Sequence, residues 1–75
     1  MTETQAYENL ANAIILSAVR DYKKALRRLN THPENAAALE TKAEVEAFFH
    51  SKWFELLTKA DPAYLIEKIR SEVTA

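Results

Sequence analysis

The sequence predicts an all-α fold: a small three-helix bundle with an additional short helix between the second and third long helices. Ala, Leu, Glu, Lys and Arg dominate the composition, and all five are strong helix formers. The chain has no glycine, on which tight β-hairpin turns depend. Its two prolines lie where a helix would begin, which is the position that tolerates a missing N–H group.

The 75 residues and the absence of cysteine indicate one domain, residues 1–75, without disulfide bonds. A chain of this length buries only roughly 60–65% of its unfolded surface, so its stability is marginal. We therefore expect stability to come from helix packing, with self-association as a further contribution.

The first long helix is expected over residues 4–29. Its inward stripe has spacings of three and four residues and consists of Ile15, Ala18, Val19, Tyr22, Ala25, Leu26 and Leu29. Asn30 is expected to end the helix in a left-handed conformation. Leu10, Ile14 and Leu16 lie off the stripe, so the N-terminal half is apolar on several faces. This indicates either a central helix or a subunit interface.

The second helix is expected over residues 33–50, beginning at Pro33 after a short turn. Its inward residues are Ala38, Val45, Phe48 and Phe49. Ser51 is a favourable N-cap for a short helix over residues 52–58. Asp61 followed by Pro62 indicates the start of the last helix, which should end near residue 73 and present Leu65, Ile66, Ile69 and Val73 to the core.

The segment from Phe48 to Leu57 is the densest aromatic and aliphatic cluster in the chain. It could form a groove for a partner helix, because Trp and Phe are favoured interface anchors, or it could be the core of the domain. Trp53 and Phe54 are adjacent and point about 100° apart on a helix, so they cannot both be central. The tyrosines at positions 7, 22 and 64 are expected at the domain edge with wet hydroxyls.

A basic run lies on the outer face of the first helix and comprises Arg20, Lys23, Lys24, Arg27 and Arg28. It could follow a phosphate backbone, or it could be a solvated face complemented by the second helix, which carries Glu34, Glu40, Glu44 and Glu46. The formal net charge of −1 gives no general preference for nucleic acid. The short helix also separates the second and third long helices, so no helix-turn-helix pair is expected.

Nothing in the sequence indicates catalysis, a metal site or a cofactor. Without glycine, phosphate-binding loops of the Walker and Rossmann kinds are excluded. Glu46 and His50 share a helical face but have no obvious third ligand. His50, Ser51 and Asp61 supply the residue types of a catalytic triad, yet neighbouring helix residues diverge and no oxyanion site is suggested. We therefore expect a protein that is not an enzyme.

No membrane span or signal peptide is expected. The longest apolar run, Ala13–Leu16, is far shorter than the ~20 residues that cross a bilayer. The first ten residues are acidic and polar, whereas a signal peptide begins with a basic segment. The absence of cysteine is typical of a reducing compartment. These features favour a soluble, cytoplasmic protein.

The stretch FFHSKWFELLTKADPAYLIEKIRSEV resembles a group of small uncharacterised helical proteins of prophages and mobile elements in low-GC Gram-positive bacteria. The positions that carry the resemblance are Phe48, Phe49, Ser51, Trp53, Phe54, Leu57, Thr58, Asp61, Tyr64, Leu65 and Ile66. The first helix is also similar, so the resemblance extends from about Ala11 to Val73. Lys52 and Pro62 depart from the pattern. The resemblance implies a phage or bacterial setting and no particular activity.

Taken together, these features predict a non-enzymatic protein-interaction module. The partner is expected to be a protein, with a second copy of the chain as one candidate. The candidate interface residues are Leu10, Ile14, Leu16, Trp53 and Phe54. The alternative is a nucleic-acid-binding protein that uses the basic face of the first helix.

Overall fold

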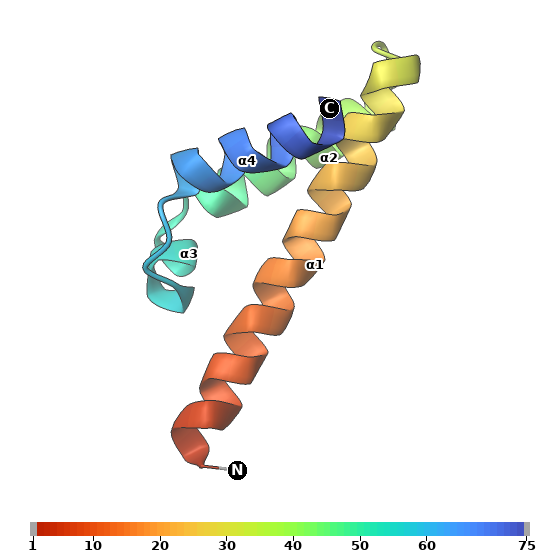
Figure 1. The fold of residues 1–75 in the computed structure, drawn as a ribbon. Helices are drawn as coiled ribbons and strands as arrows, with labels where there is room; N and C mark the ends of the chain where they lie inside the picture. Colours follow the sequence, from red (N-terminus) through yellow and green to blue (C-terminus); the bar gives the residue numbers. More distant parts are fainter. Residues whose placement is uncertain (1, 75) are drawn as a thin grey trace.

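Four helices form a small bundle in the computed structural model, which describes residues 2–74 except for the side chains of residues 4 and 7 (Figure 1). The helices are α1 (Glu3–Thr31), α2 (Ala36–Phe49), α3 (Lys52–Leu57) and α4 (Pro62–Thr74). Residues 2–74 contain no strand. The predicted fold class, three long helices with a short one between the last two, is therefore confirmed.

Helix α1 is longer at both ends than its apolar stripe indicates. It begins with a capping box, in which the Thr2 hydroxyl accepts from the Gln5 amide and the Gln5 side chain accepts from the Thr2 amide, both at 3.1 Å. Two backbone donors are satisfied in this way. At the other end the helix continues through Thr31. No residue of 2–74 has a positive φ, so the expected left-handed stop at Asn30 is wrong.

The start of α2 is also later than expected. Pro33 lies in the turn, and Asn35 is the N-cap, because its side-chain oxygen accepts from the Ala38 amide at 2.8 Å. The side-chain oxygen of an asparagine cap accepts a hydrogen bond from a backbone amide of the first turn, whereas proline has no side-chain acceptor. The Asn35 side chain, and not the Pro33 ring, therefore fixes where the helix begins.

Ser51 forms the junction between α2 and α3, as the sequence indicates. Its hydroxyl accepts from the Phe54 amide at 3.2 Å and donates to the Phe48 carbonyl oxygen at 2.6 Å. One side chain thus satisfies a terminal carbonyl of α2 and a terminal amide of α3. Asp61 caps α4 in the expected way, with its carboxylate accepting from the Ala63 amide at 3.0 Å.

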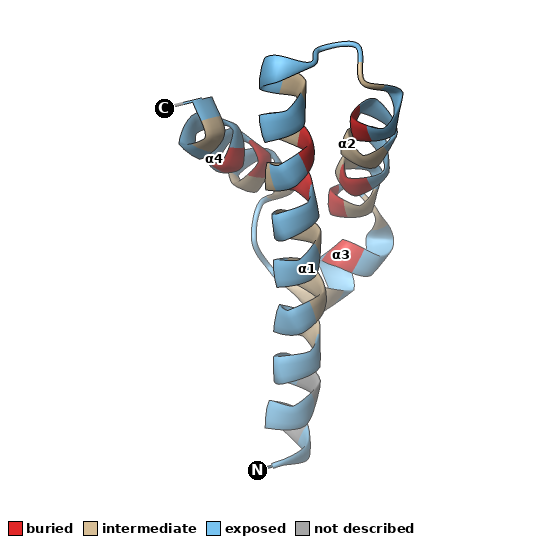
Figure 2. Ribbon diagram, turned by 90° about the vertical axis from the view of Figure 1, so that its right-hand side faces the viewer, coloured by how far each residue is buried: buried red, intermediate tan, exposed pale blue. Residues whose placement is uncertain are grey.

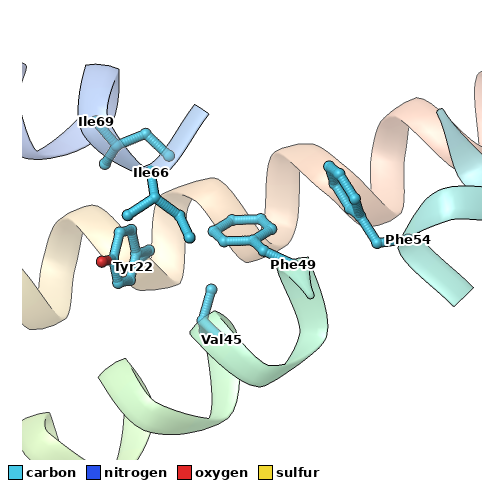
Figure 3. Close-up of a cluster of buried hydrophobic side chains, with 6 residues drawn as sticks. All are labelled: Tyr22, Val45, Phe49, Phe54, Ile66 and Ile69. Carbon is cyan, nitrogen blue, oxygen red and sulfur yellow. The ribbon is translucent and has the colours of Figure 1, made fainter. Parts of the chain in front are cut away.

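The core lies where α1, α2 and α4 meet, with α3 closing one end (Figure 3). Its buried members are Tyr22, Val45, Phe49, Phe54, Ile66 and Ile69. Phe49 is central: its ring lies 5.8 Å from that of Tyr22 and 5.5 Å from that of Phe54, in edge-to-face geometry. Such pairs add about 0.5–1.5 kcal/mol beyond their area burial. The inward residues expected for each helix all pack in or against this cluster except Leu29, which is half-buried, and Ala25 and Ala38, which are buried beside it.

Tyr22 corrects the expectation for the tyrosines, because its side chain is fully buried. Tyr64 is exposed, and the side chain of Tyr7 lies outside the described residues. The Tyr22 ring occupies the centre of the α1 stripe, while its hydroxyl reaches polar partners on α2 and α4.

Helix α1 runs along the whole molecule, and its N-terminal part extends beyond the other helices (Figures 1 and 2). A helix of 29 residues is about 43 Å long, which matches the longest dimension of 45 Å against 23 and 21 Å for the others. Among the described side chains of α1, the first that packs against the core is Ile15. The described side chains of residues 3–14 therefore contribute nothing to the core cluster.

Candidate protein-interaction surface

An apolar face lies on the side of α1 that points away from the core. Leu10 is 60% exposed and Leu16 is 53% exposed. They are six residues apart and point about 120° from each other, with Ala13 midway between them. Tyr22 is nine residues from Ala13, which places it about 180° away around the helix. The α1 apolar face, defined as Leu10, Ala13, Ile14 and Leu16, is thus centred on Ala13 opposite to the core, while Ile14, about 80° from Tyr22, lies at its edge beside α2.

The α1 apolar face brings together three of the residues expected at an interface. Leu10 and Leu16 are exposed and Ile14 is half-buried beside them. Ala13, also exposed, was not predicted, although its spacing of three residues from both leucines is a visible signal. In Figure 2, α1 stands in front of the other helices, with α4 on its left and α2 on its right. Leu10, Ala13 and Leu16 are exposed, whereas Ile14 shares a hollow with Glu44, Val45 and Phe48 of α2.

The other two interface candidates, Trp53 and Phe54, lie next to each other on α3 but differ in burial. Trp53 is 60% exposed, whereas Phe54 is 1% exposed and contacts Phe48 and Phe49 in the core. Phe54 is therefore a core residue and not an interface residue, because a buried ring cannot contact a partner. Leu56, three residues after Trp53, is 86% exposed. Trp53 and Leu56 form a second, smaller apolar patch.

The basic run of α1 is less neutralised than expected. Lys23 forms an ion pair of 3.0 Å, but its partner is Glu72 on α4 and not an acidic residue of α2. The other four members make no ion pair with any residue of 2–74, and all are exposed: Arg20, Lys24, Arg27 and Arg28. Among the described residues, no acidic side chain of α2 forms an ion pair with this run, although Glu44 lines the same hollow as Lys24 and Arg28.

Glu46, the acidic residue of α2 nearest the core, instead joins three helices. Its Oε2 accepts from the Tyr22 hydroxyl at 2.5 Å and from Arg70 Nη2 at 2.7 Å, while Arg70 Nε donates to the Tyr22 oxygen at 3.2 Å. Lys42 lies 3.2 Å away on the same helix. These contacts tie α1, α2 and α4 together where the core meets solvent.

The hydrogen bonds of this cluster shift the proton equilibria of its members. Burial acts to raise the pKa of the Glu46 carboxyl, but the hydrogen bonds from its three partners outweigh burial, and the pKa lies below its usual value. Burial raises the pKa of the Tyr22 hydroxyl, and the hydrogen bond to Glu46 raises it further against the opposing effect of Arg70. Glu46 is therefore charged and Tyr22 neutral at physiological pH, which is the arrangement of a structural cluster.

A shallow groove runs between α1 and α2. It consists of two adjoining hollows of about 650 and about 230 Å³ that share Asp21, Glu44 and Val45. Lys24 and Arg28 line the larger hollow, so groups of both charges face it. Every buried side-chain N or O atom of the described residues has a hydrogen-bond partner. The groove thus contains no buried polar group that a ligand would have to satisfy.

The residues considered for catalysis or metal binding are not assembled by the fold. Glu46 is held by Tyr22, Arg70 and Lys42, and His50 is exposed. In residues 2–74, no three His, Cys, Asp or Glu side chains gather closely enough to hold a metal ion. Ser51 and Asp61 serve as helix caps. Each of these side chains therefore has a structural explanation.

No family model, curated protein or solved structure matches the chain. The resemblance to the prophage group therefore stays a prediction. Among the described residues, no helix is both long enough and apolar enough to cross a membrane.

Proposed function

We propose that this chain is a non-enzymatic protein-interaction module and that the α1 apolar face is its contact surface. The observation that carries the proposal is the exposure of Leu10 and Leu16 on the side of α1 that is turned away from the core. Isolated helix segments of this length are marginal in water, so a partner that covered the face would stabilise it. The resemblance supports the setting that we propose, the cytoplasm of a bacterium carrying a phage or mobile element.

The size of the surface suits a modest interface. Standard specific interfaces bury roughly 800 Å² per partner, with transient ones smaller. Two leucines, an isoleucine and an alanine on one helix face supply an apolar centre, and polar residues of α1 supply the rim. Interface cores of this kind are depleted in charge, and the α1 apolar face contains no charged residue.

The proposal predicts that two charges on the α1 apolar face will abolish partner binding. The tagged wild type is compared with Leu10→Glu/Leu16→Glu in affinity capture from the source cell. Glutamate is a helix former comparable to leucine, and both sites are exposed, so circular dichroism should show an intact fold. We expect partners to be retained by the wild type and lost from the double variant. Leu39→Glu, which alters an exposed leucine of α2, is the matched control and should retain them. Equal retention by all three proteins would contradict the proposed surface.

A second candidate function is nucleic-acid binding, favoured by the four α1 cations that lack an ion pair with the described residues. It predicts binding of a labelled duplex at low salt that weakens steeply as salt rises, with a slope of about −0.9 per phosphate contact. Arg20→Gln/Lys24→Gln/Arg27→Gln should remove this binding, whereas Lys59→Gln should not. An absence of binding at low salt would exclude this function.

A further inference from the structure

We infer that the partner covering the α1 apolar face is a second copy of this chain, whose α1 lies antiparallel across it in one register. The inference rests on the proposed function and specifies both the partner and the arrangement. Four observations carry it: a continuous exposed repeat along α1, the N-terminal part of α1 that extends beyond the other helices, the distribution of charge along the helix, and the match of residues in a single register.

The exposed side of α1 follows a repeat of alternating three- and four-residue steps. Its members are all exposed: Glu3, Ala6, Leu10, Ala13, Ser17, Arg20, Lys24 and Arg27. This spacing is that of a two-helix coiled-coil seam. Ile14 and Leu16 border the seam on its two sides, so the three apolar residues that seemed scattered belong to one strip. Figure 2 shows that one side of α1 is turned away from α2, α3 and α4, and of the strip's apolar residues Ile14 is the one that borders a hollow with α2.

Small residues on the seam permit a close approach. Ala6, Ala13 and Ser17 alternate with the larger Leu10. Two helices pack best when large side chains of one face small side chains of the other. Among the described side chains of residues 3–14, none belongs to the core cluster or packs against it, and a second copy would supply contacts from the same segment.

The charges of α1 favour the antiparallel over the parallel arrangement. Residues 3–19 carry two acidic and no basic side chains, whereas residues 20–28 carry five basic side chains and one acidic. A parallel pair would set the two basic segments beside each other, and like charges at that distance repel. An antiparallel pair keeps the two basic segments apart and allows Arg20 of each helix to lie near Glu3 of its partner.

One register satisfies the apolar and the charged matches together. When Leu10 faces the partner's Ala13, Ala6 faces the partner's Ser17 and Glu3 faces the partner's Arg20. Each large residue then meets a small one, and each end of the contact has opposite charges. Lys24 and Arg27 extend past the partner's N-terminus and stay in solvent.

The absence of cysteine in this chain allows a direct test of orientation and register by engineered disulfides. We use full-length Ala6→Cys and Ser17→Cys, alone and mixed, under mild oxidation. In the inferred register, positions 6 and 17 face each other across the interface. Two copies of position 6, or two of position 17, lie eleven residues apart along the axis, about 16 Å. Disulfides require Cα atoms within about 7 Å. The mixture should therefore cross-link, and neither variant should cross-link alone.

Light scattering of the unmodified chain up to high micromolar concentration accompanies this test. We expect a mass approaching twice the 8.6 kDa of one chain, lost in Leu10→Glu/Leu16→Glu and retained in Trp53→Ala. Loss of the dimer in Trp53→Ala would place the interface on α3 and overturn the inference. Cross-linking of each cysteine variant alone would show a parallel pair and overturn it equally. A strict monomer would overturn the second copy as partner, while capture that depends on the α1 apolar face would still support the proposed function.

Discussion

Replacing Phe49 with alanine is expected to lower the free energy of unfolding by about 3–5 kcal/mol, the usual cost of deleting a buried phenylalanine. Phe49 is fully buried and lies edge-to-face against both Tyr22 and Phe54, so its loss leaves a cavity where three helices meet. A 75-residue domain has a total stability of only about 4–11 kcal/mol. Phe49→Ala should therefore be largely or partly unfolded at room temperature.

Urea denaturation followed by circular dichroism measures this effect, with all proteins at one concentration because self-association stabilises by mass action. Trp53→Ala is the matched control. It deletes a larger aromatic ring four residues after Phe49, but from an exposed position. The substitution should therefore change the free energy of unfolding by about 0.5 kcal/mol or less. A loss in Trp53→Ala as large as in Phe49→Ala would show that the core lies elsewhere.

Glu46→Gln is expected to lower stability at neutral pH by about 1–2 kcal/mol, allowing for the half-exposed Arg70 side chain. The substitution keeps an acceptor for the Tyr22 hydroxyl but removes the charge that Arg70 and Lys42 contact. The pKa of Glu46 is lowered in the folded protein. Its contribution is therefore fully present above the unfolded-state pKa, near 4.5, and is lost as pH falls through the lower folded-state pKa.

The measurement is the free energy of unfolding at neutral pH and again at pH values below the pKa of a free glutamate. The difference between the two should be smaller in Glu46→Gln than in the wild type. Glu40→Gln alters an exposed carboxylate of the same helix that makes no ion pair with the described residues, and it should preserve the wild-type difference. An unchanged pH dependence in Glu46→Gln would contradict the assigned role of the cluster.

The local parts of the fold follow from the sequence. The apolar spacing identifies the inward side of the three long helices, and Ser51 and Asp61 are recognisable as caps because a hydroxyl or carboxylate accepts hydrogen bonds from amides two or three residues away. The expected start of α1 is one residue late and that of α2 is three residues early. Thr2 with Gln5 is a capping box, and Asn35 precedes a run of alanines, so both signals were present in the sequence.

Contacts between helices were beyond sequence reasoning. The spacing shows that only one of Trp53 and Phe54 can be central, but only the approach of α3 to α1 selects Phe54. The contact between Glu46 and Arg70 likewise depends on how α2 and α4 meet beside Tyr22. A charged residue directly after a core residue, as Glu46 follows Val45 and Arg70 follows Ile69, is the signal that could have suggested it. The sequence predicts Leu10, Ile14 and Leu16 of the α1 apolar face but not Ala13. The exposure of a residue on one helix depends on which of its sides the other helices cover.

The turns of this protein also influence the unfolded chain. Residues 2–74 adopt no positive φ, so every turn among them uses backbone conformations open to any L-amino acid. The sequence therefore needs no glycine and contains none. A glycine-free chain has fewer conformations when unfolded, and a glycine replaced at a compatible site is worth about 0.4–1 kcal/mol through that effect alone. Part of the stability of this small domain thus comes from the restricted freedom of the chain before it folds.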